Sequence, residues 1–354
     1  MIMIKKNMLL NVRRLTICLS AVFCSLCANA GSGVGAYRFL NLPFDARMSG
    51  LGGENVSLQA SDVNMAGVNP ALLSGDVHNK LCANFISYLD DAKAGSLSYA
   101  YTPDSSNYFG IGFVYLGYGD FQGYDQFGNP TEEFGAGDLC VGLRYAKNLG
   151  YGMKLGVAMK PVYSHIEDYS SFALAFDVGF NYYNPEKQFS VGVSARNFGV
   201  QCKKYYDSDK RDEMPFNLQL GVTKGLQHAP FRFSVTYDRL NDWNLDYYRQ
   251  KEVKSMVGEE PENDVIKGGD MFFRHLVFGV EALLGKNFYI EAAYNHRRKR
   301  EFELSGSRGF NGFSIGTGLK VYAFNLDFSF SQYALSANTI TLSLTTDLDR
   351  FKKK

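Results

Sequence analysis

The residues that could carry out chemistry are few and scattered in this chain of 354 residues. Its histidines are His78, His165, His228, His275 and His296. His165 is followed closely by two carboxylates, Glu167 and Asp168, and a histidine beside a carboxylate is an arrangement used in general acid–base catalysis. A solvent-exposed histidine at the end of a strand accounts for the same spacing. We therefore expect a protein without enzymatic activity, with His165 as the position to check.

The cysteines do not form a metal-binding or redox motif. Half of the six cysteines lie within the first 30 residues. The others are widely spaced, unlike the ligands of zinc sites, at Cys82, Cys140 and Cys202. We interpret them as small apolar residues, and a single disulfide among them stays open. Neither a metal nor another cofactor is predicted.

A run of basic residues is the sharpest polar feature of the sequence. Arg297, Arg298, Lys299 and Arg300 are consecutive. Guanidinium groups bind phosphates and carboxylates through paired hydrogen bonds, so contact with anionic lipid such as lipopolysaccharide is one interpretation. An ordinary solvated loop is the other. The formal net charge of the chain is only +1, which argues against a nucleic-acid partner.

The N-terminus has the pattern of a secretory signal peptide over residues 1–30. Lys5 and Lys6 belong to a positively charged start, and an apolar stretch over residues 15–26 follows. Ala28 and Ala30 then fit the small-residue rule for cleavage, which predicts a mature chain beginning near Gly31. A membrane anchor is the alternative, but the apolar run is short for one.

Most of the chain after residue 80 alternates between apolar and polar residues. Ile340, Leu342 and Leu344, for example, are separated by threonine and serine. A strand with this pattern has one apolar and one polar face, and a sheet of such strands closed into a barrel can span an outer membrane. We expect fourteen strands, at residues 81–89, 94–102, 108–117, 137–147, 152–164, 171–183, 188–198, 215–224, 230–238, 271–284, 287–297, 312–322, 324–332 and 337–346. The predicted fold class is all-β, a 14-stranded antiparallel transmembrane β-barrel with an N-terminal plug or hatch segment.

Connection lengths alternate in the way expected of such a barrel. The longer segments fall at residues 118–136, 199–214, 239–270 and 298–311, and the connections between them are short. Outer-membrane barrels have short periplasmic turns and long outer loops, so we place both termini of the barrel domain 80–354 in the periplasm. The long segment 239–270 is a plausible docking surface for a protein partner. A soluble all-β protein is the alternative architecture.

Residues 31–79 lack the strand pattern and precede the first strand. A segment of this size could plug the barrel lumen or lie beneath it. The predicted inner face carries charges that could pair with it, namely Arg144, Lys154, Lys160, Asp177, Arg196, Arg232, Glu291, Lys320 and Asp327. Solvated charges lining an open pore are the other interpretation of these residues.

The sequence Asn69, Pro70, Ala71 ahead of fourteen strands resembles the FadL-type outer-membrane barrels. The resemblance implies that residues 31–79 form a hatch inside the barrel, with these three residues as the hatch motif. It also implies one possible function, a transporter or binder of a hydrophobic or lipopolysaccharide-derived ligand.

More specific sequence motifs lie at residues 36–43 (AYRFLNLP), 46–53 (ARMSGLGG) and 118–129 (YGDFQGYDQFGN). These stretches resemble the PorQ family of outer-membrane barrels in the type IX secretion system. That resemblance implies a non-enzymatic function: anchoring the surface protein PorZ, and through it PorU and PorV, in the attachment complex that handles cargo and anionic lipopolysaccharide. The resemblance does not identify which residues of this chain would contact a partner.

Overall fold

The computed structural model describes residues 36–88, 92–206, 211–245, 268–301, 311–334 and 337–351. The predicted signal peptide therefore lies outside the described residues, as do most of the predicted segment 239–270 and residues 302–310. Within the described ranges, no helix is long and apolar enough to cross a membrane.

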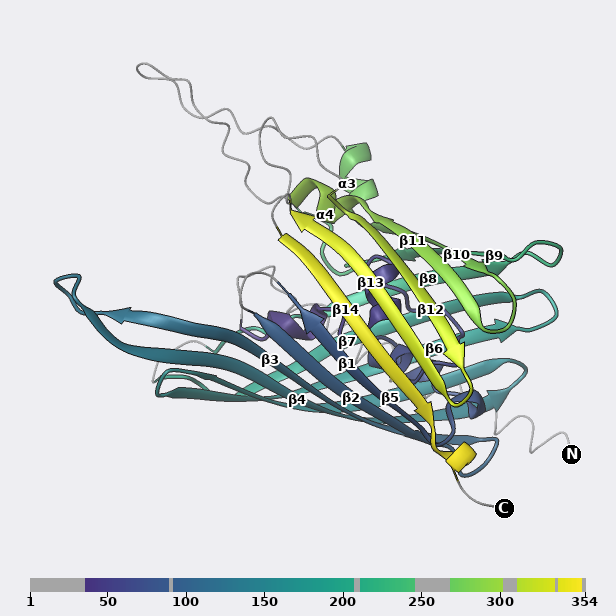
Figure 1. The fold of residues 1–354 in the computed structure, drawn as a ribbon, viewed down its shortest axis with the longest axis horizontal. Helices are drawn as coiled ribbons and strands as arrows, with labels where there is room; N and C mark the ends of the chain where they lie inside the picture. The colour runs from purple at the N-terminus through teal and green to yellow at the C-terminus, as the bar shows by residue number, and fades with distance from the viewer. Residues whose placement is uncertain are drawn as a thin grey trace, which may run out of the picture. The chain divides into compact units, whose positions relative to one another are not determined.

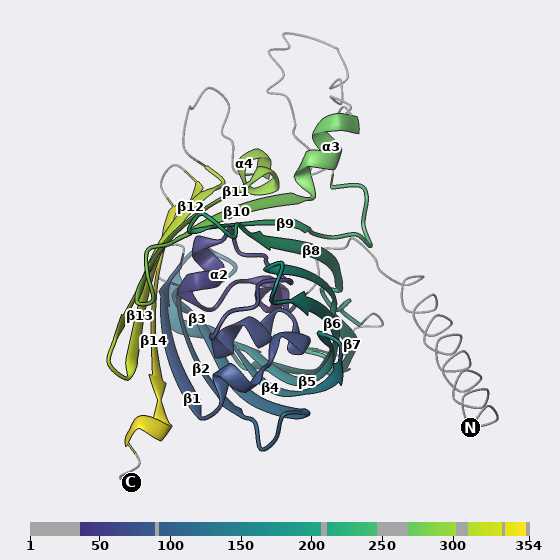
Figure 2. The same cartoon turned by 90° about the vertical axis from the view of Figure 1, so that its right-hand side faces the viewer.

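Fourteen antiparallel strands close into a barrel, in which each strand pairs with its neighbours in the chain and β1 pairs with β14 (Figures 1 and 2). The strands are β1 (Lys80–Ser87), β2 (Lys93–Tyr101), β3 (Asn107–Tyr124), β4 (Pro130–Gly150), β5 (Met153–Ile166), β6 (Tyr169–Asn184), β7 (Phe189–Lys203), β8 (Asn217–Gly225), β9 (Phe231–Tyr237), β10 (Leu276–Leu283), β11 (Phe288–Asn295), β12 (Phe313–Val321), β13 (Phe324–Ala334) and β14 (Ala337–Asp347). The predicted fold class is confirmed. We call the end where β3 meets β4 the long-loop end and the opposite end the terminal end.

The alternation in the sequence produces an apolar outer wall. On β14, Ile340, Leu342 and Leu344 are 41%, 49% and 42% exposed, whereas Thr341 between them is fully buried. Register places Leu342 beside Phe328 of β13 on the same outward face. Because successive side chains of a strand point to opposite faces, one apolar stripe per strand is enough to cover the barrel exterior.

Several boundaries differ from the sequence prediction. The expected loop 118–136 is mostly a two-stranded ribbon, because β3 and β4 continue pairing from Asp120 opposite Gly135 to Tyr124 opposite Pro130. The strand expected at 271–284 begins at Leu276, because helix α3 (Gly268–Arg274) precedes it. The strand expected at 287–297 ends at Asn295, because helix α4 (His296–Glu301) follows it.

Side chains of the connecting residues explain these differences. Asp125 accepts hydrogen bonds from the backbone N–H groups of Phe127 (2.8 Å) and Asn129 (2.9 Å), which closes a tight turn at the tip of the ribbon. Within α3, Asp270 and Arg274 stand four residues apart and form an ion pair at 3.0 Å. Both features lie outside the period-2 pattern.

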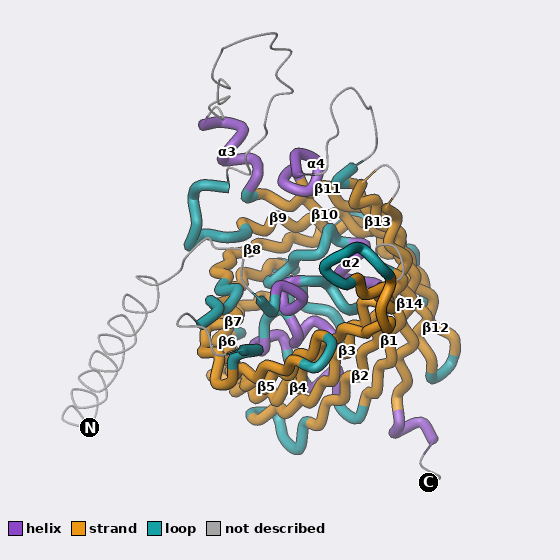
Figure 3. Tube along the Cα trace, turned by 90° about the vertical axis from the view of Figure 1, so that its left-hand side faces the viewer, coloured by secondary structure: helices purple, strands orange, loops and turns teal. Residues whose placement is uncertain are grey.

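Residues 36–79, which we call the lumen segment, lie inside the barrel (Figures 2 and 3). They form the short elements η1 (Arg38–Asn41), α2 (Ala46–Gly50), η2 (Val63–Gly67), η3 (Pro70–Leu72) and η4 (Gly75–Val77). Asp45, Asp62 and Asn69 precede three of these and accept a hydrogen bond from a backbone N–H of the first turn. A cluster of buried side chains holds the segment together, comprising Met48, Leu51, Val56, Leu58, Met65, Val68 and Leu72.

Candidate functional site

Three glycines of the barrel wall allow the lumen segment to lie directly against the wall backbone. Gly156 of β5 lies against Pro70 and Ala71, Gly179 of β6 against Asn69, and Gly192 of β7 against Val56. An added Cβ at any of the three would approach these atoms more closely than 3.0 Å, a separation that real Cβ atoms essentially never show. The wall is therefore shaped for this segment, and only glycine fits the contact.

Asn69 fastens the segment to the wall at the same place. Its side chain is fully buried. Its Oδ1 accepts from the N–H of Ala71 at 3.0 Å, while Nδ2 donates to the carbonyls of Val56 at 2.8 Å and Phe180 of β6 at 3.2 Å. The sequence Asn69, Pro70, Ala71 thus lies at the contact between lumen segment and wall. Its role as a hatch stays a prediction.

Several of the inward charges reach the lumen segment. Lys154 donates to Oε1 of Gln59 at 2.8 Å and to the carbonyl of Leu73 at 3.1 Å. Glu281 of β10 pairs with Arg47 of α2 at 2.8 Å. Lys320, in contrast, is exposed near the terminal end.

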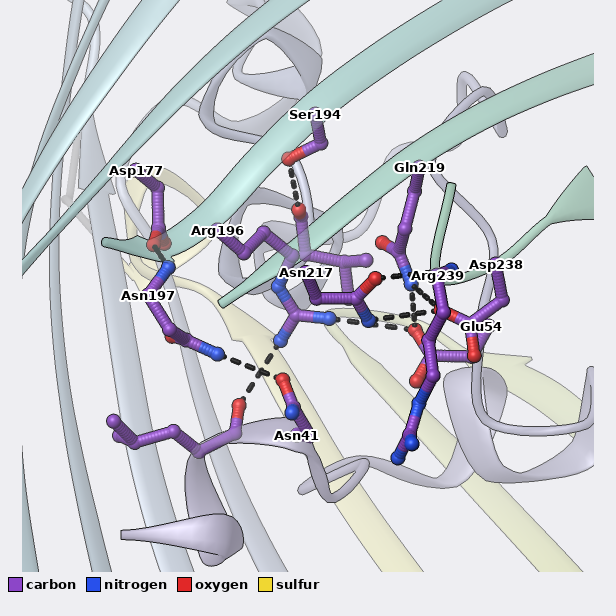
Figure 4. A network of polar contacts seen from close by, with 12 residues as sticks. Asn41, Glu54, Asp177, Ser194, Arg196, Asn197, Asn217, Gln219, Asp238 and Arg239 are labelled. Atoms are coloured by element: carbon purple, nitrogen blue, oxygen red, sulfur yellow. Dashed lines mark hydrogen bonds and ion pairs between the residues drawn. The ribbon is translucent and has the colours of Figure 1, made fainter. Parts of the chain in front are cut away.

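A buried polar network, consisting of Glu54, Arg196, Gln219 and Asp238, joins the lumen segment to three consecutive strands (Figure 4). Oε2 of Glu54 accepts from Nη1 of Arg196 at 3.3 Å and from Nε2 of Gln219 at 2.6 Å. The same Gln219 nitrogen donates to Oδ1 of Asp238, just after β9, at 2.7 Å. None of the four residues is more than 4% exposed.

A β-bulge in β7 turns Arg196 and the next residue, Asn197, inward together. Between the pairs Phe176–Phe198 and Val178–Ala195, β7 has one more residue than β6. Asn197 has a φ of +58° and is fully buried, which a regular strand next to buried Arg196 would not permit. This bulge delivers a second polar side chain to the lumen.

The bulge also adds a hydrogen bond to a buried ion pair. Nζ of Lys160 lies 2.7 Å from Oδ1 of Asp177, and both side chains are buried. The backbone N–H of Asn197 donates to the same oxygen at 2.7 Å, and its side-chain amide donates to Asn41 of η1 at 2.7 Å. The pair is thereby linked to the lumen segment.

The basic run predicted to contact anionic lipid turns largely inward. Arg297 and Arg298 are only 9% and 7% exposed. Nη2 of Arg297 pairs with Oδ2 of Asp238 at 3.0 Å, and the guanidinium of Arg298 lies against Gly53 of the lumen segment. A direct lipid contact through these two residues is at odds with their burial. Lys299 and Arg300 are partly exposed, and for them the lipid contact stays a prediction.

Asp270 ties α3 to α4 at the long-loop end. It accepts from Nε2 of His296 at 2.9 Å, from Nε of Arg300 at 3.1 Å and from Nε of Arg274 at 3.0 Å. Partial burial would by itself raise the pKa of Asp270. The hydrogen bonds and positive charges outweigh that effect and hold the pKa of this carboxyl below its ordinary value.

A cavity of about 70 Å³ separates part of the lumen segment from the wall. Its apolar lining includes Phe39, Leu40, Leu42, Phe44, Val68, Val114 and Cys140. Its cations are Arg144 of β4, Lys160 of β5 and Arg196 of β7. We call this space the lumen cavity. A volume this small has room for a head group but not for a long chain.

Arg144 differs from the other two cations of the lumen cavity. Lys160 pairs with Asp177 and Arg196 with Glu54. Arg144 makes no hydrogen bond or ion pair with any residue in the described part of the chain. Its guanidinium lies against Gly112 and Gly142, where an added Cβ would stand 2.6 Å and 3.1 Å away. These glycines leave room for the guanidinium to face the cavity.

No family model and no curated protein match the chain. Solved structures do match it. The toluene transporter TodX of Pseudomonas putida aligns with a TM-score of 0.51 and 10% identity, covering 86% of this chain and 96% of that chain. A deltaS2 mutant of the TodX monoaromatic hydrocarbon channel aligns with a TM-score of 0.50 and 12% identity, covering 86% and 97%. The chain has the fold of the TodX channel.

Among the described residues, the structure gives His165 no partner for acid–base catalysis. His165 stacks on the ring of Tyr163 with 6.2 Å between centroids and makes no hydrogen bond to a serine or carboxylate among the described residues. The catalytic interpretation of His165 therefore has no support. Cys82, Cys140 and Cys202 are free thiols. No group of three metal-ligating side chains occurs within the described ranges.

Sequence reasoning did not single out four residues that organise the lumen of this barrel, Glu54, Asn197, Gln219 and Asp238. Gln219 lies on the polar face of a predicted strand, so the alternation already indicates its inward direction. Asp238 ends the strand expected at 230–238 and shares its polar face, so the alternation indicates its inward direction as well. Glu54 and Asn197 lie in irregular backbone, in the lumen segment and the β7 bulge, where periodicity carries no signal.

Proposed function

We propose that this chain is a non-enzymatic outer-membrane barrel that binds an apolar ligand with an anionic head group between the lumen segment and the wall. The observation that carries the proposal is Arg144, whose guanidinium faces a mainly apolar cavity and has no partner among the described residues. A buried charge is costly unless it is paired, and an incoming carboxylate or phosphate would pair it.

The similar structures support a passage for apolar molecules at the level of the fold, since TodX is described as a toluene transporter and a monoaromatic hydrocarbon channel. Lys160 and Arg196 are neutralised by Asp177 and Glu54, and Asp45 also lines the lumen cavity, so the preference for an anionic amphiphile over a neutral hydrocarbon rests on Arg144. A fatty acid and a lipopolysaccharide-derived fragment share this chemistry. The cavity is small, so passage of a whole ligand requires the lumen segment to move, as a hatch does.

Replacing Arg144 by methionine is expected to weaken binding of dodecanoate by about 10-fold or more, because a hydrogen bond to a charged group contributes about 1.5–3 kcal/mol. Dodecanol, which lacks the charge, should bind both proteins alike. Native mass spectrometry of the full chain in nanodiscs measures both. Lys93→Met, which removes an exposed cation from β2, is the matched control. Equal dodecanoate binding by the Arg144→Met protein would refute the proposal.

A second role, suggested by the resemblance to the PorQ family, is anchoring of PorZ at the cell surface, with PorU and PorV bound indirectly. For this role the long-loop end would face the cell exterior and both termini the periplasm. Residues 118–135, which we call the β3–β4 arm, favour it. The arm extends past the last pairs with its neighbours, Lys93–Gly117 and Ala136–Ile166, and Tyr124 and Phe127 in it are 66% and 79% exposed. Exposed aromatic side chains of this kind are common in protein interfaces.

Deleting the gene is expected to release PorZ from the cell surface, and a chain whose arm is replaced by a two-residue turn should fail to restore it. Immunoblots of surface and medium fractions measure this. The shortened chain should keep the heat-modifiable gel mobility of a folded barrel. PorZ that stays on the surface of the deletion strain would rule out the anchoring role.

A further inference from the structure

We propose that the polar network couples occupancy of the lumen cavity to the position of helix α4 at the long-loop end. The inference rests in part on the proposed function, because it assumes an anion in the cavity. It goes beyond that function by connecting the interior of the barrel to a surface where a partner could bind. The coupling follows two contact routes, and Figure 4 shows the part of the first route that runs from Arg196 through Glu54 and Gln219 to Asp238.

Arg196 is the end of the network that a ligand would reach. It lines the lumen cavity and donates through Nη1 to Glu54 at 3.3 Å and through Nη2 to the carbonyl of Leu40 at 3.1 Å. Its Nε is buried and has no hydrogen-bond partner in the part of the chain that the structure describes. A carboxylate entering the cavity therefore offers this guanidinium a better arrangement than it has, in competition with Glu54.

Gln219 connects Glu54 to Asp238, so a shift of the Glu54 carboxylate would also affect Asp238. Its Nε2 donates to both carboxylates, at 2.6 Å and 2.7 Å, so that one amide holds two buried acids together. The amide must present nitrogen to them, because its oxygen would be repelled by both. Burial and the charge of Asp238 already raise the pKa of Glu54. Losing Arg196 as a partner would destabilise the Glu54 carboxylate further and disturb its bond to Gln219.

Asp238 carries this first route to α4. Its Oδ2 pairs with Arg297, in the first turn of that helix, at 3.0 Å. Burial opposes ionisation of Asp238, but the charges of Arg297 and Arg239 and the amides of Gln219 and Asn217 lower its pKa. Asp238 therefore stays ionised and holds Arg297.

The second route is direct contact between the lumen segment and α4. Arg298 lies against Gly53, next to Glu54, and Asn295, immediately before α4, donates to the carbonyl of Gly52 at 3.2 Å. A displacement of residues 52–54 therefore reaches α4 without passing through Gln219. Because α4 is bound to α3 through Asp270, the displacement extends to a larger part of the long-loop end.

Thermodynamic linkage makes the coupling reciprocal. If an anion in the cavity loosens α4, then a partner that holds α4 in place lowers the affinity for the anion by the same factor. Typical coupling energies correspond to factors of about 5 to 150. A receptor that docks on α3 and α4 would thus change the affinity for the ligand, and the ligand would change the affinity for the receptor.

Hydrogen exchange of the full chain in nanodiscs tests the proposal, with dodecanoate as the probe and the backbone amides of residues 296–301 as the readout. Saturating dodecanoate is expected to speed exchange of these amides by about 5-fold or more. Arg196→Met should produce a similar increase without any ligand. Gln219→Leu should reduce the response to dodecanoate, because only the direct contact remains.

Arg232→Met is the matched control. Arg232 also bridges wall and lumen segment, through Glu281 and the carbonyl of Gln59, but it contacts no member of the polar network. Its loss should leave α4 exchange unchanged. Heat-modifiable mobility shows that each variant is folded.

The outcomes separate this inference from the proposed function. Dodecanoate that binds without changing α4 exchange overturns the coupling and leaves the proposed function intact. If dodecanoate does not bind at all, the proposed function fails, and the ligand-free Arg196→Met measurement decides the coupling alone. Unchanged α4 exchange in that variant overturns it, and faster exchange than in the Arg232→Met protein supports it.

Discussion

A single methyl group at position 156 is expected to displace the lumen segment. In Gly156→Ala the new Cβ would meet the backbone of Pro70 and Ala71 at less than 3.0 Å. Backbone on both sides cannot rotate away as a flexible side chain would, so either the segment or β5 must shift. Overpacking of this kind typically costs about 1–3 kcal/mol of the free energy of unfolding. Because the segment lies inside the barrel, its displacement should also open a conducting path.

Urea unfolding in lipid vesicles and single-channel conductance in planar bilayers measure the two effects. Gly110→Ala is the matched control, because Gly110 also faces the lumen segment but an added Cβ would lie at an ordinary 3.5 Å from Leu73. The control should be as stable and as closed as the original protein. If Gly156→Ala matches it in both measurements, the contact between Gly156 and the segment does not hold the segment in place.

The second large effect is expected from Lys160→Met. This change leaves the carboxylate of Asp177 buried without its cation, since the two groups lie 2.7 Å apart with side-chain exposures of 7% and 2%. Breaking a buried ion pair from one side costs about 3–5 kcal/mol of the free energy of unfolding. Urea unfolding in vesicles should show this loss.

A second substitution should recover most of the stability that Lys160→Met loses. In Lys160→Met with Asp177→Asn the charge is gone, while the asparagine oxygen can still accept from the N–H of Asn197. Arg350→Met is the control for loss of an exposed pair, with Asp347 at 3.5 Å, and should change stability by less than about 1 kcal/mol. A double variant no more stable than Lys160→Met would show that the buried charge is not the source of the loss.

The two proposed roles are compatible because they use different parts of the molecule. Ligand binding concerns the lumen cavity, and anchoring concerns the long-loop end. The polar network lies between them and contacts both. If the coupling holds, a surface partner and a lumen ligand would each change the binding affinity of the other.

Basic residues illustrate how far sequence reasoning reaches. The run at residues 297–300 suggests a solvated, lipid-facing cluster, yet Arg297 and Arg298 point into the barrel. Sequence could not show this, because their partners Asp238 and Gly53 lie about 60 and 245 residues away and meet them only after the barrel closes.

The sequence by itself determined the wall: its strands, their antiparallel order and their apolar outer face. A strand's side chains alternate by backbone geometry alone, so Ile340, Leu342 and Leu344 predict an outward face without knowledge of their neighbours. Tertiary structure alone decided which groups meet in the interior. The bulge at Asn197, the glycine contacts of Asn69 and the bridge through Gln219 depend on groups brought together by closure. No local period records such contacts, because each depends on the positions of residues remote in the chain.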